Sequence, residues 1–378
     1  MSYRFDDRND LPRSHYCLIL HINIISAPML RCLWRLTLIK TVSFIVGAIV
    51  FLLVLSCTIW VLTTPPLPKD VQKKLNLSLE KPLPELISGQ SGYVRSGSLK
   101  IWYQLKSPEG IPVRGTVLLI NGMGSSSLYW PSEVYEPLLA AGYQVLLTDH
   151  RGCGASSWVT NWTKETAYDL SDMMRDNLAV MDSLGINQVH VMGASMGGMI
   201  AQEMALQYPH RLKSLTSIMS SGFLEDPELP QGKTFRYNML RLFLRYGLSG
   251  SDEGMAKLMV STYHSLQGQG GFDVEHIAHT TLYELRHRQG FDHNLPVQQF
   301  TAISLSGSRL ERLEGLEVPT MVIHGDRDPL LNIAQAKKYA ARIPGAKTLW
   351  VEGMGHAMAP VYVKEWMEHE VQFLEANN

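Results

Sequence analysis

Hydrophobic positions are distributed unevenly along the chain, and the longest apolar run stands near its beginning. Thr41 to Leu62 contains no Asp, Glu, Lys, Arg or His, and about 20 apolar helical residues are enough to cross the hydrocarbon core of a bilayer. Arg31, Arg35 and Lys40 precede this run, whereas the next basic residue is Lys69. Because basic residues favour the cytoplasmic side of a span, this asymmetry predicts a cytoplasmic N-terminus and a catalytic domain outside the cytoplasm.

Three other interpretations of the apolar run stay open: a core helix, a cleaved signal peptide and a lipoprotein signal. A core helix would have a polar face, and the apolar part of a signal peptide usually has only about 7 to 15 residues. Val54 to Cys57 loosely resembles a lipoprotein cleavage box, but the chain continues apolar to Leu62. We therefore expect residues 1–40 to be cytoplasmic and residues 41–62 to be an uncleaved single-pass anchor.

A proline-containing segment, residues 63–91, follows the anchor. Its prolines are Pro65, Pro66, Pro68, Pro82 and Pro84. Proline has no backbone N–H and interrupts a helix, so it favours extended chain. We expect this segment to be an extended linker and the folded domain to occupy residues 92–378.

Beyond the linker, short apolar runs alternate with helix-length segments. Tyr93 to Leu105 first alternates around a polar turn at Ser96–Ser98, as in a β-hairpin. The later runs are short enough for strands buried on both faces of a sheet, and their alternation with helices predicts an α/β fold with a mostly parallel sheet. These runs are Thr116–Ile120, Val145–Thr148, Val189–Met192, Leu215–Met219, Thr320–His324 and Thr348–Val351.

Helical segments stand between these strands, and each of the clearest ends beside a glycine or proline. They are Trp130–Ala141, Thr166–Leu184 and Ile333–Arg342. Between Gly222 and Gly315 the alternation gives way to helix-like sequence without further strands. We expect a helical cap inserted at about residues 223–315.

Composition limits the partners only slightly. The chain has 378 residues, a formal net charge of -1 at pH 7 and four cysteines. A near-zero net charge gives no field that would attract nucleic acid, so we expect no nucleic-acid partner. Only Cys153 lies beyond the anchor, so the predicted domain has no internal disulfide and depends on its hydrophobic core.

One local motif carries most of the chemical information. Gly193 to Gly197 has the pattern G-x-S-x-G, between the expected strand Val189–Met192 and helix-like sequence at Ile200–Tyr208. In a strand-turn-helix context this pattern forms a nucleophile elbow, because the glycines allow a sharp turn that exposes the serine hydroxyl. The bare pattern also occurs by chance, so the context and the partner residues decide that Ser195 is the predicted nucleophile.

A serine nucleophile needs a base for its proton and a carboxylate that orients the base. His356 ends a glycine-containing turn after the last predicted strand, and Asp326 and Asp328 stand in the turn after Thr320–His324. Both turns fall at the carboxyl ends of parallel strands, where open α/β sheets bind ligands. We expect His356 to be the base and Asp328 the acid, with Asp326 as a turn-capping residue.

The tetrahedral intermediate of acyl transfer needs backbone donors for its oxyanion. Asn121 to Gly124 follows the first buried strand, and no Gly-Lys-Ser/Thr ending suggests a phosphate loop. We predict that the amides of Met123 and Met196 donate to the oxyanion. An ordinary glycine-rich turn is the alternative interpretation.

Together these segments resemble the α/β-hydrolase superfamily over Gly92 to roughly Leu374, and the elbow is similar to that of bacterial esterases of the aclacinomycin methylesterase type. Asp149 to Ser156 resembles the superfamily's D-x-R-G-x-G-x-S turn. The resemblance implies the same roles for Ser195, Asp328, His356, Met123 and Met196. One position departs from it: most relatives have His-Gly where this chain has Asn121-Gly122, and because that histidine is usually structural, the change concerns local packing.

The identity of the nucleophile narrows the reaction. Haloalkane dehalogenases and epoxide hydrolases of the superfamily carry aspartate at the elbow, so Ser195 argues against both. We expect a carboxylic ester hydrolase, an esterase or lipase that works through an acyl-enzyme without cofactor or metal. Hydrolysis of thioesters, lactones or carbon-carbon bonds, a cofactor-free haloperoxidase or perhydrolase, and a non-catalytic binding module remain alternatives.

The substrate is less readable than the reaction. Tyr129 and Trp130 are candidates to line a substrate pocket, although aromatic residues at this spacing are more often part of the core. We expect a small-molecule or lipid ester as substrate. Anchoring at a membrane favours lipid esters, whereas acyl length and alcohol group are not encoded in any recognisable motif.

Overall fold

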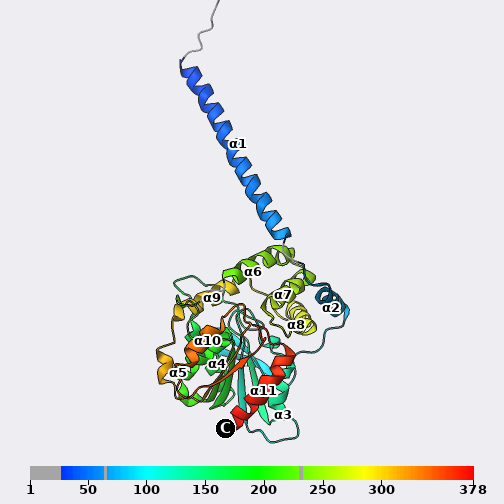
Figure 1. The fold of residues 1–378 in the computed structure, drawn as a ribbon, viewed down its shortest axis with the longest axis vertical. Helices are drawn as coiled ribbons and strands as arrows, with labels where there is room; N and C mark the ends of the chain where they lie inside the picture. The colour runs from blue at the N-terminus through cyan, green and yellow to red at the C-terminus, as the bar shows by residue number, and fades with distance from the viewer. Residues whose placement is uncertain (1–26, 64–65, 230–232) are drawn as a thin grey trace, which may run out of the picture. The chain divides into compact units, whose positions relative to one another are not determined.

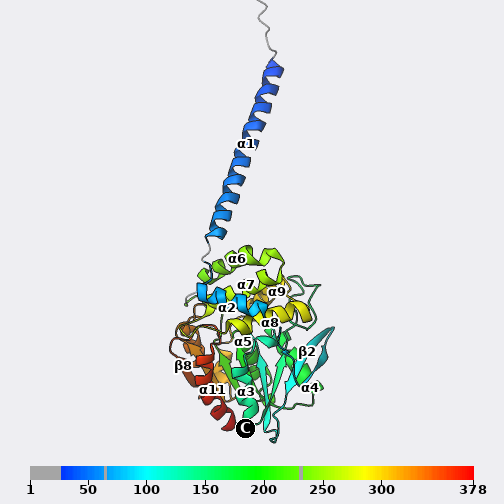
Figure 2. The same cartoon turned by 90° about the vertical axis from the view of Figure 1, so that its right-hand side faces the viewer.

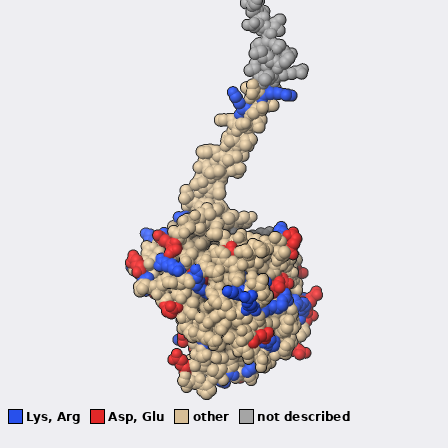
Figure 3. Space-filling view, turned by 180° about the vertical axis from the view of Figure 1, so that it is seen from behind, with Lys and Arg blue, Asp and Glu red and all other residues tan. Residues whose placement is uncertain are grey.

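The protein is described by a computed structural model that covers residues 27–63, 66–229 and 233–378. It divides into two compact units, Met1–Trp60 and Val61–Asn378. The described part of the first is the long helix α1 (Ala27–Leu62) (Figure 1). Its stretch Trp34–Leu62 is long and apolar enough to cross a membrane, and Figure 3 shows basic side chains only near its N-terminal end. Residues 1–26 of the expected cytoplasmic segment lie outside the described residues.

Helix α2 (Lys69–Glu80) contradicts the expectation of an extended linker. Pro68 stands before its first residue and Pro82 after its last, so the prolines bound a helix without interrupting it. The buried side chains of Val71 and Leu75 pack in a hydrophobic cluster with residues of the cap, and Figure 2 shows α2 beside cap helices α7 and α8. Burial of this apolar face stabilises a helix that the proline count alone argues against.

An eight-stranded sheet forms the centre of the second unit. Its strands are β1 (Gln90–Ser96), β2 (Leu99–Lys106), β3 (Gly115–Ile120), β4 (Tyr143–Thr148), β5 (Val189–Ala194), β6 (Leu212–Ile218), β7 (Thr320–Gly325) and β8 (Lys347–Val351), in the order β1-β2-β4-β3-β5-β6-β7-β8. The first two form the predicted hairpin, in which Ser96 pairs with Leu99. Strand β2 is antiparallel to β4, and all the pairs from β4 to β8 are parallel. The predicted α/β fold with a mostly parallel sheet is confirmed.

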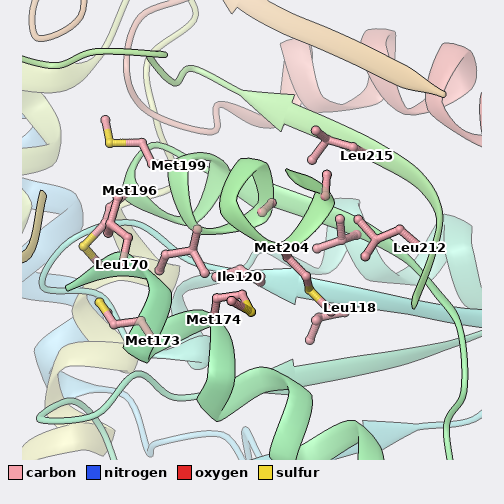
Figure 4. Close-up of a cluster of buried hydrophobic side chains, with 14 of the residues drawn as sticks. Leu118, Ile120, Leu170, Met173, Met174, Met196, Met199, Met204, Leu212 and Leu215 are labelled. Atoms are coloured by element: carbon pink, nitrogen blue, oxygen red, sulfur yellow. The ribbon is translucent and has the colours of Figure 1, made fainter. Parts of the chain in front are cut away.

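Alternate residues of the central strands enter two hydrophobic layers. In β3, Leu118 and Ile120 belong to one buried cluster, and Val117 and Leu119 belong to the other. The first cluster (Figure 4) is covered by α4 (Leu170–Ser183), α5 (Met196–Gln207) and α10 (Ile333–Ala340). The second is covered by α3 (Ser132–Ala140) and α11 (Pro360–Glu375), which Figure 1 shows across the sheet from α5 and α10. Burial on both faces explains why these strands read as continuous apolar runs.

The interval 223–315, where the sequence predicts a helical cap, contains four described helices. They are α6 (Lys233–Tyr246), α7 (Asp252–Leu266), α8 (Val274–His287) and α9 (Leu295–Ser306). Figures 1 and 2 show them gathered at one end of the sheet. Short 3-10 helices complete the unit at Ser127–Tyr129, Pro209–Arg211, Gly247–Ser249 and Arg312–Gly315.

Candidate active site

Ser195 occupies the sharp turn between β5 and α5. Its backbone has φ 54° and ψ -118°, a conformation that a residue with a side chain rarely adopts. The flanking glycines are required by space: a Cβ at Gly193 would overlap the carbonyl of Gly197, and one at Gly197 would overlap the carbonyl of Ile120. The strand, the turn and the helix therefore hold the Ser195 hydroxyl at the carboxyl end of the sheet, as the motif predicts.

Three predicted side chains meet at this end of the sheet. His356 Nε2 lies 3.0 Å from Ser195 Oγ, and His356 Nδ1 lies 2.6 Å from Asp328 Oδ2. The other oxygen of Asp328, Oδ1, accepts from the amides of Leu330 and Leu331, each at 2.8 Å. With the Nδ1–H of His356 donated to Asp328, Nε2 is left as the acceptor for the serine proton. The arrangement can move a proton from the hydroxyl to the imidazole.

A second histidine, His324, lies beside the same carboxylate and was not singled out in the sequence. Its Nε2 is 3.4 Å from Asp328 Oδ2 and 2.8 Å from the carbonyl oxygen of Leu331. Burial lowers the pKa of His324, so its imidazole is neutral near pH 7, and its Nε2–H is donated to the Leu331 carbonyl. It supports the carboxylate without introducing a competing positive charge.

The loop Gly353–His356, called here the histidine loop, is held from two sides. Asp326 Oδ1 accepts from the Gly353 amide at 2.7 Å, which is the capping contact predicted for that aspartate. From the cap side, the Leu266 carbonyl accepts from the His356 amide at 2.7 Å, and the Gln269 amide donates to the Gly353 carbonyl at 2.8 Å. The end of α7 thus positions the histidine, a contact that no local motif indicates.

The loop after β3, Asn121–Ser126, called here the β3 loop, borders Ser195. A Cβ at Gly122 would lie 3.3 Å from Ser195 Cβ, so the backbone passes directly beside the nucleophile position. Met196, the first residue of α5, has an amide that no helix carbonyl can reach. The Met123 amide has no acceptor among the described residues. Both predicted donors are therefore free to bind an anion at Ser195.

Asn121 explains the departure from the His-Gly pattern. Its side-chain amide donates to the Ser126 carbonyl at 2.8 Å, and its Oδ1 accepts from the Gly122 amide at 2.8 Å. Its carbonyl oxygen lies 2.8 Å from Nε2 of His150, whose pKa is lowered by burial. The asparagine closes the β3 loop on itself, and the substitution is a matter of local packing.

The two aromatic candidates for substrate contact are both buried. Trp130 packs in the core cluster on the α3 and α11 face of the sheet, so its environment is that of a core residue. The Tyr129 hydroxyl is hydrogen-bonded to Thr281 Oγ1 at 3.0 Å, and its ring stacks on Tyr263 of the cap. For both residues a substrate contact stays a prediction, and Tyr129 is the one that faces the cap.

A buried group of charges, the cap ion cluster, joins the cap to the sheet and consists of Asp149, Glu284 and Arg288. Their side chains are at most 3% exposed, and Arg288 of the cap is paired with both carboxylates. Ser126 donates to Glu284 at 2.5 Å and Ser127 donates to Asp149 at 2.7 Å. Burial raises the pKa of Glu284 to about 7. The cluster therefore connects the cap, through Glu284 and Arg288, to the C-terminal end of the β3 loop and to Asp149 after β4.

No group of three or more His, Cys, Asp or Glu side chains within the described ranges is arranged to hold a metal ion. The thiol of Cys153 is buried, and burial raises its pKa well above the ordinary value. A protonated, enclosed thiol is a poor nucleophile, so Cys153 is not a candidate nucleophile.

Comparison with known proteins defines the class. A family model described as alpha/beta hydrolase fold matches residues 115–360, and the chain belongs to this family. It is a hydrolase. Among the relatives, a rhodomycin D methylesterase from Streptomyces sp. (strain C5) is 31% identical over 272 residues, which cover 68% of this chain and 89% of that protein. A pimeloyl-[acyl-carrier protein] methyl ester esterase from Aeromonas hydrophila is 26% identical over 266 residues, covering 68% and 92% of the two chains.

Solved structures support the same fold. A hydrolase from Pseudomonas aeruginosa PA01 superposes with a TM-score of 0.56 at 21% identity, over 76% of this chain and 99% of that one. A membrane phospholipase A superposes with a TM-score of 0.56 at 19% identity, over 88% and 98% of the two chains. At such identities the likeness concerns the arrangement of sheet, helices and cap.

Proposed function

We propose that this protein is a serine esterase in which Ser195, His356 and Asp328 form the catalytic triad. Ser195 Oγ attacks the carbonyl carbon of an ester while His356 Nε2 takes the hydroxyl proton. The imidazolium then protonates the departing alcohol, which leaves an acyl-enzyme on Ser195. Water attacks the acyl group with His356 again as the base, and release of the carboxylic acid restores the serine.

The observation that carries this proposal is the continuous hydrogen-bond chain from Ser195 Oγ through His356 to Asp328. The buried carboxylate keeps the proton on Nδ1 and stabilises the imidazolium that forms during each transfer. Negative charge on the former carbonyl oxygen is stabilised by the amides of Met123 and Met196. Met196 follows Ser195 and Met123 follows Gly122, which passes beside Ser195, and neither amide has an acceptor within the described residues. Relatives named as esterases favour an ester as the bond that is cleaved.

We further propose that the substrate is a small-molecule or lipid ester that the enzyme meets at a membrane surface. The candidate span Trp34–Leu62 would anchor the chain, and the basic residues before it favour a cytoplasmic N-terminus. The catalytic unit, which follows the span, would then be extracytoplasmic. Short-chain and long-chain esters presented to the full-length protein in detergent micelles distinguish a general esterase from a lipase by the chain length that gives the highest kcat/KM.

The triad is tested with a fluorophosphonate probe and p-nitrophenyl acyl esters on the full-length protein in detergent. We expect stoichiometric labelling and ester turnover by the wild type, and neither by Ser195→Ala. Ser220→Ala is the matched control, since Ser220 is buried nearby and donates to the Ser195 carbonyl at 2.7 Å. Labelling that persists in Ser195→Ala would falsify the assignment, and peroxide-dependent bromination faster than ester turnover would replace it with a perhydrolase.

A further inference from the structure

Gln299 of cap helix α9 contacts the middle of the β3 loop. Its side chain is completely buried, and its Oε1 accepts from the Gly124 amide at 2.7 Å. Gly124 has φ +73°, and a Cβ there would meet nothing within 4 Å. Side-chain packing therefore does not hold the backbone at Gly124, and the hydrogen bond to Gln299 helps to fix it.

The restrained peptide is next to the donor that the proposed reaction uses. Gly124 follows Met123, and Gly122 stands beside Ser195. The start and end of the loop are joined by Asn121. Its middle is closed only by a long backbone bond of 3.4 Å, from the Ser125 amide to the Gly122 carbonyl, so the shorter bond from Gly124 to Gln299 adds the stronger restraint there. A shift of the Gly124 peptide would turn the Met123 amide away from the position of the oxyanion, because the two peptides share the backbone angles of Met123.

The second atom of the same carboxamide makes no hydrogen bond within the described residues. Nε2 of Gln299 is buried and has no hydrogen-bond partner among the described residues. From the 2.7 Å contact of Oε1 and ordinary amide bond lengths, Nε2 lies within about 5 Å of the Gly124 amide. An unsatisfied buried polar atom destabilises a fold. Because Oε1 of Gln298 is also buried without a partner in the described part of the chain, the two neighbouring glutamines differ in the contact with Gly124, and that contact carries the inference.

We propose that Gln299 is a positioning residue for the proposed ester hydrolysis, in which the cap holds the Met123 amide on the oxyanion through the Gly124 amide. The inference rests on the proposed function. It also gives the cap a part in the chemical step, since the residue that holds the Met123 donor in place comes from α9 and not from the sheet.

The test compares Gln299→Met with Gln298→Met in the full-length protein. Gln298 is the neighbouring buried glutamine of α9, but its Nε2 donates to the Val159 carbonyl at 3.1 Å, away from the β3 loop. Active sites are counted with the fluorophosphonate probe, so that kcat is expressed per functional site. We expect kcat of Gln299→Met to fall by about 10- to 100-fold, less than the loss of a whole oxyanion donor, with KM changed by less than about threefold. Gln298→Met should keep kcat within about threefold.

A second variant, Gln299→Glu, keeps an oxygen for the Gly124 amide and gives a signature that a packing role lacks. When ionised, the new carboxylate opposes negative charge on the oxyanion; when protonated, it accepts from Gly124 as the amide does. The ratio of its kcat to the wild-type kcat should therefore rise as pH falls, whereas the same ratio for Gln298→Glu should stay flat.

Two outcomes overturn the inference. One is a Gln299→Met enzyme with wild-type kcat per titrated site, and the other is a Gln299→Glu ratio that does not change with pH. Both are distinguishable from failure of the proposed function, which would appear as a wild-type protein that neither reacts with the probe nor turns over esters.

Discussion

The triad and the cap ion cluster use buried carboxylates in opposite ways. At the triad, Asp328 faces an imidazole that can gain and lose a proton, and its second oxygen is held by two backbone amides. In the cap ion cluster, Asp149 and Glu284 face the guanidinium of Arg288, which does not lose its proton in proteins. The first arrangement can relay a proton to and from a substrate, whereas the second surrounds a cation that stays ionised.

The difference teaches what determines the role of a buried acid in this fold. Asp328 follows β7 directly and its partner follows β8, so two neighbouring strands present the pair at one edge of the sheet. Asp149 follows β4, but Arg288 comes from the cap, and it also lies over the ring of Trp102 at 4.4 Å. The cluster therefore ties the inserted cap to the sheet through Asp149 and Trp102.

The largest expected effect comes from replacing the triad carboxylate. Asp328→Asn should lower kcat by roughly 10⁴-fold, because the amide no longer holds the Nδ1–H tautomer of His356 or stabilises its cation. Asp326→Asn is the control in the same turn, since an asparagine oxygen can still accept from the Gly353 amide. Steady-state ester hydrolysis of both variants measures the contrast, and equal losses would show that the turn matters more than the charge.

A smaller effect, on stability, is expected from Arg288→Met. It leaves two carboxylates buried without a cation, and breaking a buried pair in this way typically costs about 3–5 kcal/mol. Arg286 is the matched control on the same helix, because its partner Asp252 and its own side chain are nearly half exposed, and such pairs contribute less than about 1 kcal/mol. Urea unfolding measures the free energy of unfolding of both variants. Similar midpoints for the two would mean that the cap ion cluster does not stabilise the fold.

The smallest effect concerns pH. The pKa of Glu284 is raised by burial to about 7 from an ordinary value of 4.5, so between these two pH values the folded protein binds more protons there than the unfolded chain. The free energy of unfolding must then fall as pH rises through this window, by up to about 3 kcal/mol for this group, and level off above it.

Glu284→Gln isolates this contribution. The difference in unfolding free energy between wild type and Glu284→Gln should vary across pH 4.5 to 7, measured by urea unfolding at several pH values. Glu275→Gln, at a half-exposed position of the same helix, controls for removal of a charge. A wild-type-minus-variant difference that stays constant with pH would contradict a raised pKa in the cluster.

Much of the fold was predictable because its signals are local. The strands from Thr116 to Val351 are short apolar runs buried on both faces, and the elbow at Ser195 is encoded within five residues. The partners of the nucleophile could be predicted from a rule about chain order and from their positions after strands. The geometry between Ser195, His356 and Asp328 agrees with that prediction, and its catalytic use remains to be tested by the variants above.

The misses all involve contacts between distant parts of the chain. Helix α2 was not predicted from the sequence, because its flanking prolines suggest extended chain. Its stability comes from burial of Leu75 against the cap. The Leu266 carbonyl and the His356 amide are hydrogen-bonded across 90 positions of the chain. Gln299 and Gly124 are hydrogen-bonded across 175 positions. No periodicity or motif marks such pairs.

Residue pattern alone was enough to predict the α/β class, the candidate nucleophile Ser195 and a hydrolase, because strand burial, turn geometry and nucleophile identity depend on neighbours in the chain. Packing of the cap on the sheet determined which cap residues contact the candidate site and which charged side chains are buried. The partners of Gln299, Arg288 and Leu266 come close only when α7, α8 and α9 pack against the sheet. That packing depends on the fit of many side chains distant in the sequence, so no local pattern encodes it.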